Sequence, residues 1–416
     1  MQLTAPFWRP RRPVVALLVG GILAGVGPAP DAQGQEVRAD AVTTVYRESG
    51  GPLEITVVNP SATVAAALDD HVELAASWSA GVVTGASVVV VDAPSGGGGV
   101  DAITSATRLY DLRNVVGGSL TLRDDRSSVT GTYAYGTEND YRSHSLSVTG
   151  RTELFDRNTA LELSYGRGFD QVCNLAQPGA TEAVDRQRLP SSDGCFTADD
   201  RVAQELSLQT FQGGWTQAWT PVLATQLVGT AQVLEGYQGN PYRAVWLGRA
   251  AAQENHPEHR ARFALGLGVR IWLEPVQAAL QAFGRAYRDS WDVQSLTAEL
   301  AWEQTLGDTL RLRVRGRYYD QTGAIFYSDD YARDPRGQYF TGDRELSPFS
   351  SWTVGAQLRW VAPPDDEGRA LGFLDGFELL VKADWIRNTF RDFRYGQAAV
   401  PNRDALVGTL ALQARF

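Results

Sequence analysis

Apolar and polar residues alternate with a period of two over long stretches of this 416-residue chain. In residues 260–273 every odd position is apolar, whereas Arg260, Arg262 and Arg270 are at even positions. The same alternation recurs in residues 222–236, 352–360 and 406–416. A period of two places successive side chains on opposite faces of a β-strand. Such runs exceed the usual strand length of about 5–6 residues and suit a tilted strand that crosses a bilayer.

The connections between these segments are alternately short and long. Short turns are expected at residues 69–70, 124–126, 156–158, 220–221, 274–275 and 307–308, and longer loops near 85–107, 172–201, 237–258, 322–349 and 390–403, with a shorter one at 136–140. Counting between them predicts sixteen strands, with centres near residues 44, 60, 78, 116, 131, 148, 164, 210, 229, 266, 282, 299, 315, 356, 382 and 410. We therefore predict an all-β fold, a membrane-spanning antiparallel up-and-down β-barrel of about 16 strands with short periplasmic turns and long extracellular loops.

The first 34 residues have the composition of a secretory signal peptide. Arg9, Arg11 and Arg12 precede an apolar run at 14–26, and small residues around Ala32 and Gly34 offer a cleavage zone. A retained N-terminal anchor helix is the alternative. No later stretch approaches ~18 consecutive apolar residues, so transmembrane helices are not expected. We predict a signal peptide at 1–34, a barrel at 35–416, and a location among the lipids of the outer membrane of a Gram-negative-type bacterium.

Aromatic residues gather near the predicted strand ends. Those beside short turns or at the terminus are Phe155, Trp219, Trp272, Trp360 and Phe416, and those at the opposite ends are Trp291 and Trp352. Two aromatic belts at two interfaces are typical of a lipid-facing barrel. The last strand ends on Phe416, which we expect to close the barrel and to act as the terminal signal for barrel-assembly machinery.

The strand at residues 310–318 carries the clearest candidate chemistry. Apolar residues alternate there with Arg311, Arg313, Arg315 and Arg317. One arginine facing lipid at mid-bilayer costs about 2–4 kcal/mol, so these side chains are expected to line the lumen. The other lumen-lining candidates are Glu299 and Glu303 on the preceding strand, Arg359, Lys382 and Asp384 on the following strands, and Arg270. The ladder could set a transverse field that favours anions and small polar solutes, or its charges could pair across strands and stiffen the interior.

Cys173 and Cys195 flank a polar loop in a chain predicted to be exported. We expect a disulfide between them rather than two free thiols. A bridge across a loop of this length would stabilise the fold by roughly 3 kcal/mol.

No motif indicates catalysis, a metal site or a cofactor. Glycines 96–99 lack the following Lys-Ser/Thr of a phosphate loop, and the acidic residues of 329–343 lack EF-hand spacing. His256 and His259 leave a metal shell incomplete. His144, between two serines, invites comparison with membrane phospholipases, but nothing else supports a triad. We therefore expect no enzyme, no metal and no cofactor, and the net charge of −10 argues against nucleic acid as a partner.

Several short motifs together resemble one known family. They are EITVVNP at 54–60, VDAITSAT at 100–107, ENDYRS at 138–143 and the closing strand. Their arrangement resembles a family of bacterial outer-membrane proteins known as domain of unknown function 3570. The resemblance implies a barrel, and it brings no assigned activity and no catalytic residue.

The function predicted from these features is a passive channel or an export conduit for small polar or anionic solutes. The alternative is a non-conducting barrel that acts as a scaffold or anchor for a periplasmic or surface partner. A plugged interior would favour the scaffold, and an open aqueous path would favour the channel.

Overall fold

The computed structural model describes residues 36–49, 55–84, 88–89, 104–105, 111–247, 251–329, 331, 337–395, 398–399 and 402–416. The chain divides into two units, Met1–Gln35 and Glu36–Phe416. The predicted signal peptide at 1–34 and glycines 96–99 lie outside the described residues. Within the described residues, no helix is long and apolar enough to cross a membrane.

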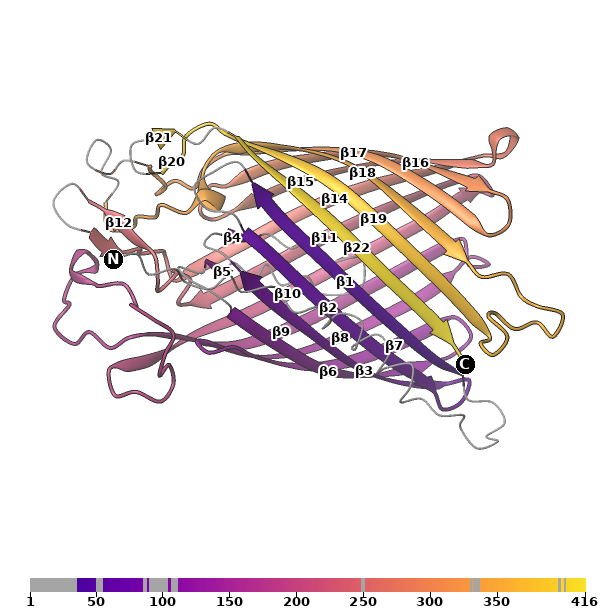
Figure 1. Ribbon diagram of the computed structural model, residues 1–416, viewed down its shortest axis with the longest axis horizontal. Helices are drawn as coiled ribbons and strands as arrows, with labels where there is room; N and C mark the ends of the chain where they lie inside the picture. Colours follow the sequence, from indigo (N-terminus) through magenta and orange to yellow (C-terminus); the bar gives the residue numbers. More distant parts are fainter. Residues whose placement is uncertain are drawn as a thin grey trace, which may run out of the picture. The chain divides into compact units, whose positions relative to one another are not determined.

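Sixteen antiparallel strands form one closed barrel (Figure 1). They are β1 (Val37–Ser49), β2 (Ile55–Ala67), β3 (Val72–Thr84), β6 (Asp111–Arg123), β7 (Ser127–Thr137), β8 (Tyr141–Leu154), β9 (Thr159–Leu175), β10 (Arg201–Thr220), β11 (Leu223–Gly236), β14 (His259–Leu273), β15 (Ala278–Asp289), β16 (Gln294–Leu306), β17 (Leu310–Gln321), β18 (Phe349–Val361), β19 (Gly376–Phe390) and β22 (Asn402–Arg415). The predicted fold class is confirmed, and all sixteen predicted centres fall within these strands.

Shorter elements lie in the connections. Within the described residues, three two-stranded antiparallel sheets pair β4 (Val88–Val89) with β5 (Thr104–Ser105), β12 (Ala244–Trp246) with β13 (Ala251–Gln253), and β20 (Arg394–Tyr395) with β21 (Ala398–Ala399). Single 3₁₀ turns are η1 (Ala183–Asp185), η2 (Glu274–Val276) and η3 (Arg344–Leu346).

The first and last strands close the sheet. β1 pairs with β22 from Arg38 opposite Arg415 to Ser49 opposite Asp404. Beyond that register, the Phe416 amide donates to the Val37 carbonyl at 2.9 Å and the Val37 amide donates back at 3.2 Å. Full closure leaves the sixteen-stranded sheet without an unpaired edge, which a membrane-embedded sheet requires.

The two ends of the barrel differ as predicted, with exceptions at both ends. The β1–β2 and β15–β16 connections, at 50–54 and 290–293, are short although they join strands at the long-loop end. At one end, connections of four residues or fewer join β2 to β3, β6 to β7, β8 to β9, β10 to β11, β14 to β15 and β16 to β17. At the same end, the β18–β19 connection at 362–375 is longer than the sequence analysis indicated. It folds into a compact turn, in which the Ala370 amide donates to the Leu374 carbonyl at 2.7 Å, and Leu374 is buried with Ala362 and Ala414.

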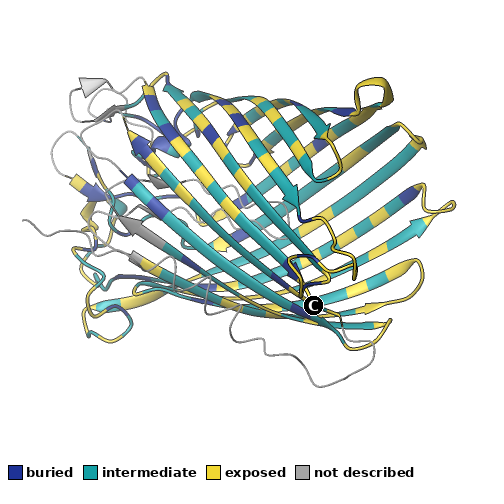
Figure 2. Ribbon diagram, turned by 45° about the vertical axis from the view of Figure 1, so that its right-hand side comes forward, coloured by how far each residue is buried: buried dark blue, intermediate teal, exposed yellow. Residues whose placement is uncertain are grey.

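Each strand of the barrel has one apolar exposed face. Along one cross-strand row, Leu300 lies opposite Gly316, then Val354, Trp385 and Leu406 follow on β18, β19 and β22. Leu300, Val354 and Leu406 are 57%, 56% and 61% exposed. Figure 2 shows the resulting alternation of exposed and less exposed residues along the strands. Large apolar side chains exposed in such a band are what a lipid-facing surface requires, so we refer to it as the apolar face.

The aromatic belts are only partly as expected. Phe155, Trp219 and Trp352 are 75%, 57% and 55% exposed, as belt residues would be. Trp291 is 3% exposed, so its predicted place in a belt is wrong. Its indole packs inside the loop structure at that end of the barrel, because the short β15–β16 connection is covered by a neighbouring loop.

Candidate functional site

The face opposite the apolar face is strongly charged on β14–β19, and we call this part of the sheet the basic face. The register places Arg317 and Arg313 of β17 opposite Glu299 and Glu303 of β16. On the same face, Arg359 of β18 lies opposite Arg311 of β17. Within these six strands the face carries ten cationic side chains and five carboxylates, namely Arg260, Arg262, Arg270, Arg285, Arg311, Arg313, Arg315, Arg317, Arg359, Lys382, Asp289, Glu299, Glu303, Glu378 and Asp384.

Ion pairs cross-link the middle of the basic face. Glu299 accepts from Arg313 and Arg315, each at 3.2 Å. Arg315 also pairs with Asp384 at 3.0 Å, and Lys382 lies 2.9 Å from the same carboxylate. The five side chains are partly accessible, except Asp384, whose side chain is 3% exposed.

The flanks of the basic face are less tightly paired. Arg270 lies 3.4 Å from Glu303, with its side chain 56% exposed. Arg359 pairs with Glu378 at 2.8 Å between Nε and Oε2. Arg311 is exposed and forms no ion pair within the described residues. The arrangement therefore combines a paired centre with an exposed guanidinium toward the short-turn end.

Sequence reasoning missed several members of this face. Glu378 accepts from the predicted Arg359, and Arg260 pairs with Asp289 through Nε at 2.8 Å. The alternation of residues 260–273 already placed Arg260 and Arg262 with Arg270, so that signal could have identified them. The Arg315–Asp384 contact could not be found this way, because it joins β17 to β19 across β18.

At mid-strand the same face of the sheet is neutral and small-sided on β6–β9, whereas charged residues of this face lie nearer the strand ends, namely Asp111, Arg113, Arg123, Arg151, Glu153, Glu162 and Asp170. Its mid-strand positions are mainly serine, threonine, alanine and glycine: Gly117, Ser119, Thr121, Thr130, Thr132, Ala134, Ser145, Ser147, Thr149, Ser164, Gly166 and Gly168. Hydroxyls pair across strands, with Thr121 and Thr130 oxygens 2.9 Å apart and Thr149 and Ser164 oxygens 2.7 Å apart. Charge is thus concentrated on one part of this face of the barrel.

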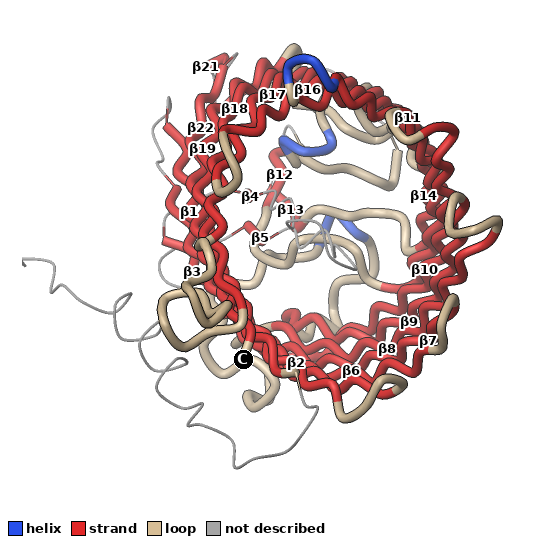
Figure 3. Tube along the Cα trace, turned by 90° about the vertical axis from the view of Figure 1, so that its right-hand side faces the viewer, coloured by secondary structure: helices blue, strands red, loops and turns tan. Residues whose placement is uncertain are grey.

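Three long connections pack together at the barrel end opposite the C-terminus (Figure 1). We call their described residues within 176–200, 237–258 and 322–348 the loop cap. The Gln253 amide donates to the Arg186 carbonyl at 2.8 Å, and the Leu189 amide donates to the Pro241 carbonyl at 2.7 Å. Asn255 forms an antiparallel bridge with Phe340. Figure 3, seen along the barrel, shows β12, β13 and their loops projecting within the ring of strands.

A buried charged cluster joins two of these loops. Arg243 lies 2.9 Å from Glu254 and 2.8 Å from Asp343, and the Thr341 hydroxyl donates to Glu254 at 2.9 Å. Burial raises the pKa of the Glu254 carboxyl, but the nearby Arg243 and His256 outweigh it and hold that pKa below its ordinary value. The cluster is therefore ionised at neutral pH and replaces hydrophobic packing at the centre of the loop cap.

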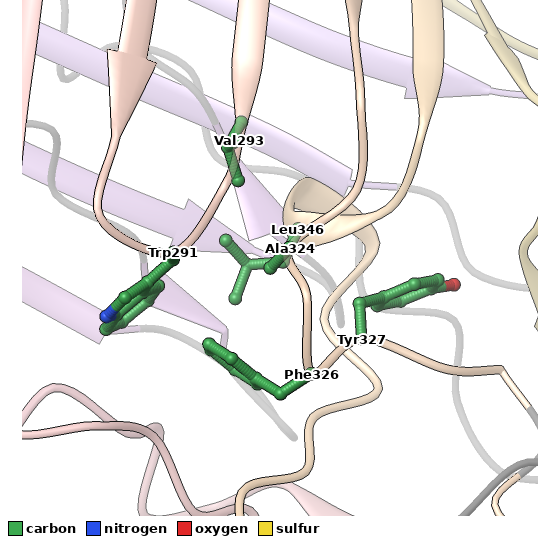
Figure 4. Packing of buried hydrophobic residues seen from close by; sticks show 6 residues of the cluster. All are labelled: Trp291, Val293, Ala324, Phe326, Tyr327 and Leu346. Atoms are coloured by element: carbon green, nitrogen blue, oxygen red, sulfur yellow. The ribbon is translucent and has the colours of Figure 1, made fainter. Parts of the chain in front are cut away.

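A buried hydrophobic group is linked to that cluster through His256, which lies 3.6 Å from Glu254. Trp291, Val293, Ala324, Phe326, Tyr327 and Leu346 form one buried group (Figure 4). The Trp291 and Phe326 rings lie edge to face at 5.1 Å, and His256 lies 5.2 Å from Trp291. The Arg260 guanidinium at the end of β14 sits 4.0 Å from the Trp291 ring centre. These contacts attach the loop cap to the strand ends.

Two further links hold the loop cap in place. Cys173, in β9, is joined to Cys195 by a disulfide, with 5.8 Å between the Cα atoms. Arg344 of η3 donates to the fully buried Glu48 of β1 at 2.5 and 3.1 Å. Arg403 of β22 approaches the same carboxylate at 3.7 Å. The loop cap is therefore anchored to the strands at the barrel seam and also at β9.

The remaining candidates for chemistry are the histidines and the acidic residues of the loops. Within the described ranges, no group of three His, Cys, Asp or Glu residues is placed to hold a metal ion. The Nδ1 atom of His144 in β8 and the Tyr133 hydroxyl oxygen are hydrogen-bonded at 2.8 Å. Its neighbours Ser143 and Ser145 lie on the opposite face of β8, by strand alternation. They therefore cannot act with His144 as a dyad.

No curated protein sequence matches the chain. Among solved structures, a bacterial polysaccharide outer membrane secretin is 10% identical, with 93% of this chain and 100% of that chain covered and a TM-score of 0.48. OccD3 (OpdP) of Pseudomonas aeruginosa is 9% identical, with 91% of each chain covered and a TM-score of 0.42. The siderophore receptor PirA from Acinetobacter baumannii is 11% identical, with 90% and 58% covered and a TM-score of 0.43.

These similarities concern the fold alone, because the identities are so low. The sequence comparison is more specific, since one family model matches residues 26–363. That span begins before β1 and ends just after β18, and it includes the whole basic face except its β19 residues. The chain belongs to the family described as "Protein of unknown function (DUF3570)".

Proposed function

We propose that the protein is an outer-membrane channel or export conduit that passes small polar or anionic solutes through a lumen lined by the basic face. The observation that carries this proposal is the excess of cations on that face, ten against five carboxylates in β14–β19. A cationic wall opposite a neutral, hydroxyl-rich wall would attract anions and let polar solutes exchange their water for hydroxyl groups.

The accessibility of the charged side chains supports a water-filled interior. Arg313, Lys382 and Arg359 remain 29%, 29% and 38% exposed despite their ion pairs. Every buried apolar cluster of the described residues lies in the loops or near a strand end. Barrels of about 16–18 strands are wide enough for an aqueous channel, and the paired centre would then form a wet, charged constriction.

The second candidate is a non-conducting barrel that acts as a scaffold or anchor for a periplasmic or surface partner. The loop cap favours it, because loops held by buried ion pairs at the barrel mouth would narrow any path. In either case we propose that the protein is not an enzyme, that it assembles through barrel-assembly machinery, and that nucleic acid is not among its partners.

We place the protein in the outer membrane, with the loop cap outside the cell. Both native cysteines are disulfide-bonded, so a single introduced thiol can be labelled selectively. Glu258→Cys at the cap should react with a membrane-impermeant reagent on intact cells, and Asp125→Cys in a short turn should react only after lysis. The reverse pattern would contradict this orientation.

Conductance in a planar bilayer tests the channel against the scaffold. Wild-type protein should conduct and prefer anions, most strongly at low salt, because fields are screened over about 10 Å at 0.1 M. Arg311→Gln should reduce the anion preference without loss of stability, since no carboxylate loses its partner. Arg387→Gln, on the apolar face and paired with Asp404 at 3.6 Å, is the control and should leave selectivity unchanged. No conductance in wild type would favour the scaffold.

A further inference from the structure

The apolar face contains one arginine in an unusual position. Arg167 lies on β9 between Tyr165 and Phe169, on the same face as those exposed side chains. Its register neighbours are Leu146 on β8 and Gln209 on β10. It forms no ion pair within the described residues, and its guanidinium sits 5.0 Å from the Phe169 ring centre. An arginine facing lipid without an anion is costly.

A groove in the apolar face leads to this arginine. It crosses β2, β3 and β6–β9, and its lining includes Leu120, Tyr133, Leu146, Val148 and Tyr165. Gly131 forms part of its floor, with open space where a Cβ would project. Arg167 is the one charged residue among those that line it. The groove thus has the chemistry of an acyl-chain site with a single cation.

More hydrogen-bond donors lie beyond Arg167, toward the loop end of the strands. His144 is opposite Phe169 in the register and shares a hydrogen bond with the Tyr133 hydroxyl. Arg142 is two residues further along β8 and lies 4.3 Å from the Phe196 ring centre. Glu205 is on the same face beyond Gln171, and no ion pair joins it to either arginine within the described strands.

Other arginines on the apolar face near the loop end differ in having carboxylate partners. Arg387 lies 3.6 Å from Asp404 and Arg288 lies 3.7 Å from Asp292. Arg142 and Arg167 lack such a partner in the described structure, so an anion from outside the chain is the remaining way to balance them. Because an apolar groove adjoins Arg167, that anion would carry an acyl chain.

We infer that this surface is a binding site for a phosphorylated lipid, with an acyl chain in the groove and the headgroup phosphate held by Arg167, Arg142 and His144. Arginine suits this role because its planar fork of donors matches phosphate oxygens. The inference depends on the barrel spanning a membrane and not on what the lumen passes. A free phosphate ion would gain nothing from the groove, so the lipid is the ligand we commit to.

Lipid retention in detergent tests the inference. Wild-type protein would be mixed with phosphatidylglycerol or phosphatidylcholine of the same acyl chains, and bound lipid would be counted by native mass spectrometry. Wild type should retain phosphatidylglycerol preferentially, and Arg167→Gln should weaken that retention about tenfold. Arg142→Gln should weaken it as well, and Arg387→Gln is the matched control that should behave as wild type. Channel conductance should be unaffected by Arg167→Gln, which separates this inference from the proposed function.

Three results would overturn the inference. Equal retention of the two lipids by wild type, or unchanged retention in both Arg167→Gln and Arg142→Gln, would show that no headgroup is recognised. Competition by inorganic phosphate alone would indicate a site for the free ion. A change from oligomer to monomer in Arg167→Gln would show that the groove contacts a second copy of the chain instead.

Discussion

Arg315 and Asp384 form a bidentate ion pair that passes over an intervening strand, with Nε–Oδ1 and Nη2–Oδ2 distances of 3.0 and 3.1 Å. The residue between them in the register is Gly355 of β18. A Cβ atom at Gly355 would lie 1.8 Å from the Asp384 Oδ1 atom. The absence of a side chain at this position therefore allows β17 and β19 to be linked directly, and it sets the geometry at the centre of the basic face.

The first prediction follows from that contact. Gly355→Ala should displace Asp384 and break its bidentate pair with Arg315, which we expect to lower the free energy of unfolding by about 1–3 kcal/mol. Thermal unfolding in detergent, followed by circular dichroism, measures this loss. Gly316→Ala is the control, because nothing lies within 4 Å of its added Cβ. Equal stability of the two variants would mean that the pair contributes little.

Period-two alternation was sufficient to predict the barrel and its strand faces. It separates Arg311, Arg313, Arg315 and Arg317 from the apolar residues between them, because strand geometry alone fixes that division. It could not reveal which carboxylate each arginine contacts. Those contacts depend on the register of neighbouring strands and, for Asp384, on the missing side chain of Gly355.

The loop cap was beyond sequence reasoning for a different physical reason. Arg243, Glu254 and Asp343 come from two loops with no repeating pattern, and about ninety residues separate Glu254 from Asp343 along the chain. The position of Trp291 at a strand end predicts a place in an interface belt, yet a loop that is distant in sequence buries it. Tertiary contacts of this kind leave no periodic signal.

The second prediction concerns the charged cluster in the loop cap. Glu254→Gln should leave the buried Arg243 with Asp343 as its remaining carboxylate, and loss of one partner of a buried pair costs about 3–5 kcal/mol. Because the barrel strands do not depend on this contact, the cost should appear as local opening. Hydrogen exchange of residues 237–247 and 251–258 should increase in the variant and stay low in β15–β17. Glu258→Gln changes an exposed neighbour and should have no effect.

The third prediction is the pH dependence of the same cluster. Burial raises the pKa of Glu254 in the folded protein, but Arg243 and His256 lower it by more, so its net shift is downward. Its ionisation therefore stabilises the loop cap fully above the ordinary carboxyl pKa of about 4.3 and contributes less as the pH falls below that value. Hydrogen exchange of the cap, corrected for its intrinsic pH dependence, should show equal protection at pH 7 and pH 5.5 (about one unit or more above that value). Opening already at pH 5.5 would show that another group controls the cap.

The fourth prediction concerns the disulfide. Replacing both Cys173 and Cys195 with serine should destabilise the intervening loop by roughly 3 kcal/mol through the entropy of the open chain. Leu189 packs against both cysteines, so the loop should become sensitive to protease. Cleavage within 176–200 should rise while the barrel strands stay resistant. An unchanged cleavage pattern would mean that the contacts with residues 241 and 253 are sufficient to hold the loop.

The last prediction concerns Phe416, which contributes to the barrel in two separable ways. Its backbone exchanges two hydrogen bonds with Val37 at the seam, and its side chain packs against the buried cluster that contains Ala362 and Leu374. Phe416→Ser keeps the backbone bonds and removes the ring, whereas deletion of Phe416 removes both. If the terminal aromatic is also read during assembly, both variants should reach the outer membrane in reduced amounts. Phe416→Tyr, which keeps an aromatic ring, should assemble normally.

Comparing the amount of each variant in cell envelopes with its thermal stability separates a defect in assembly from a loss of folding free energy. Each variant would be refolded from denaturant into detergent, and its thermal unfolding would be compared with its level in cell envelopes. A ring packed at a strand end contributes on the order of 1–2 kcal/mol, so refolded Phe416→Ser should melt only slightly below wild type while its level in cells falls several-fold. A fall in stability large enough to account for the lost yield would assign Phe416 a packing role alone. Normal levels of the serine variant in cells would remove the assembly role.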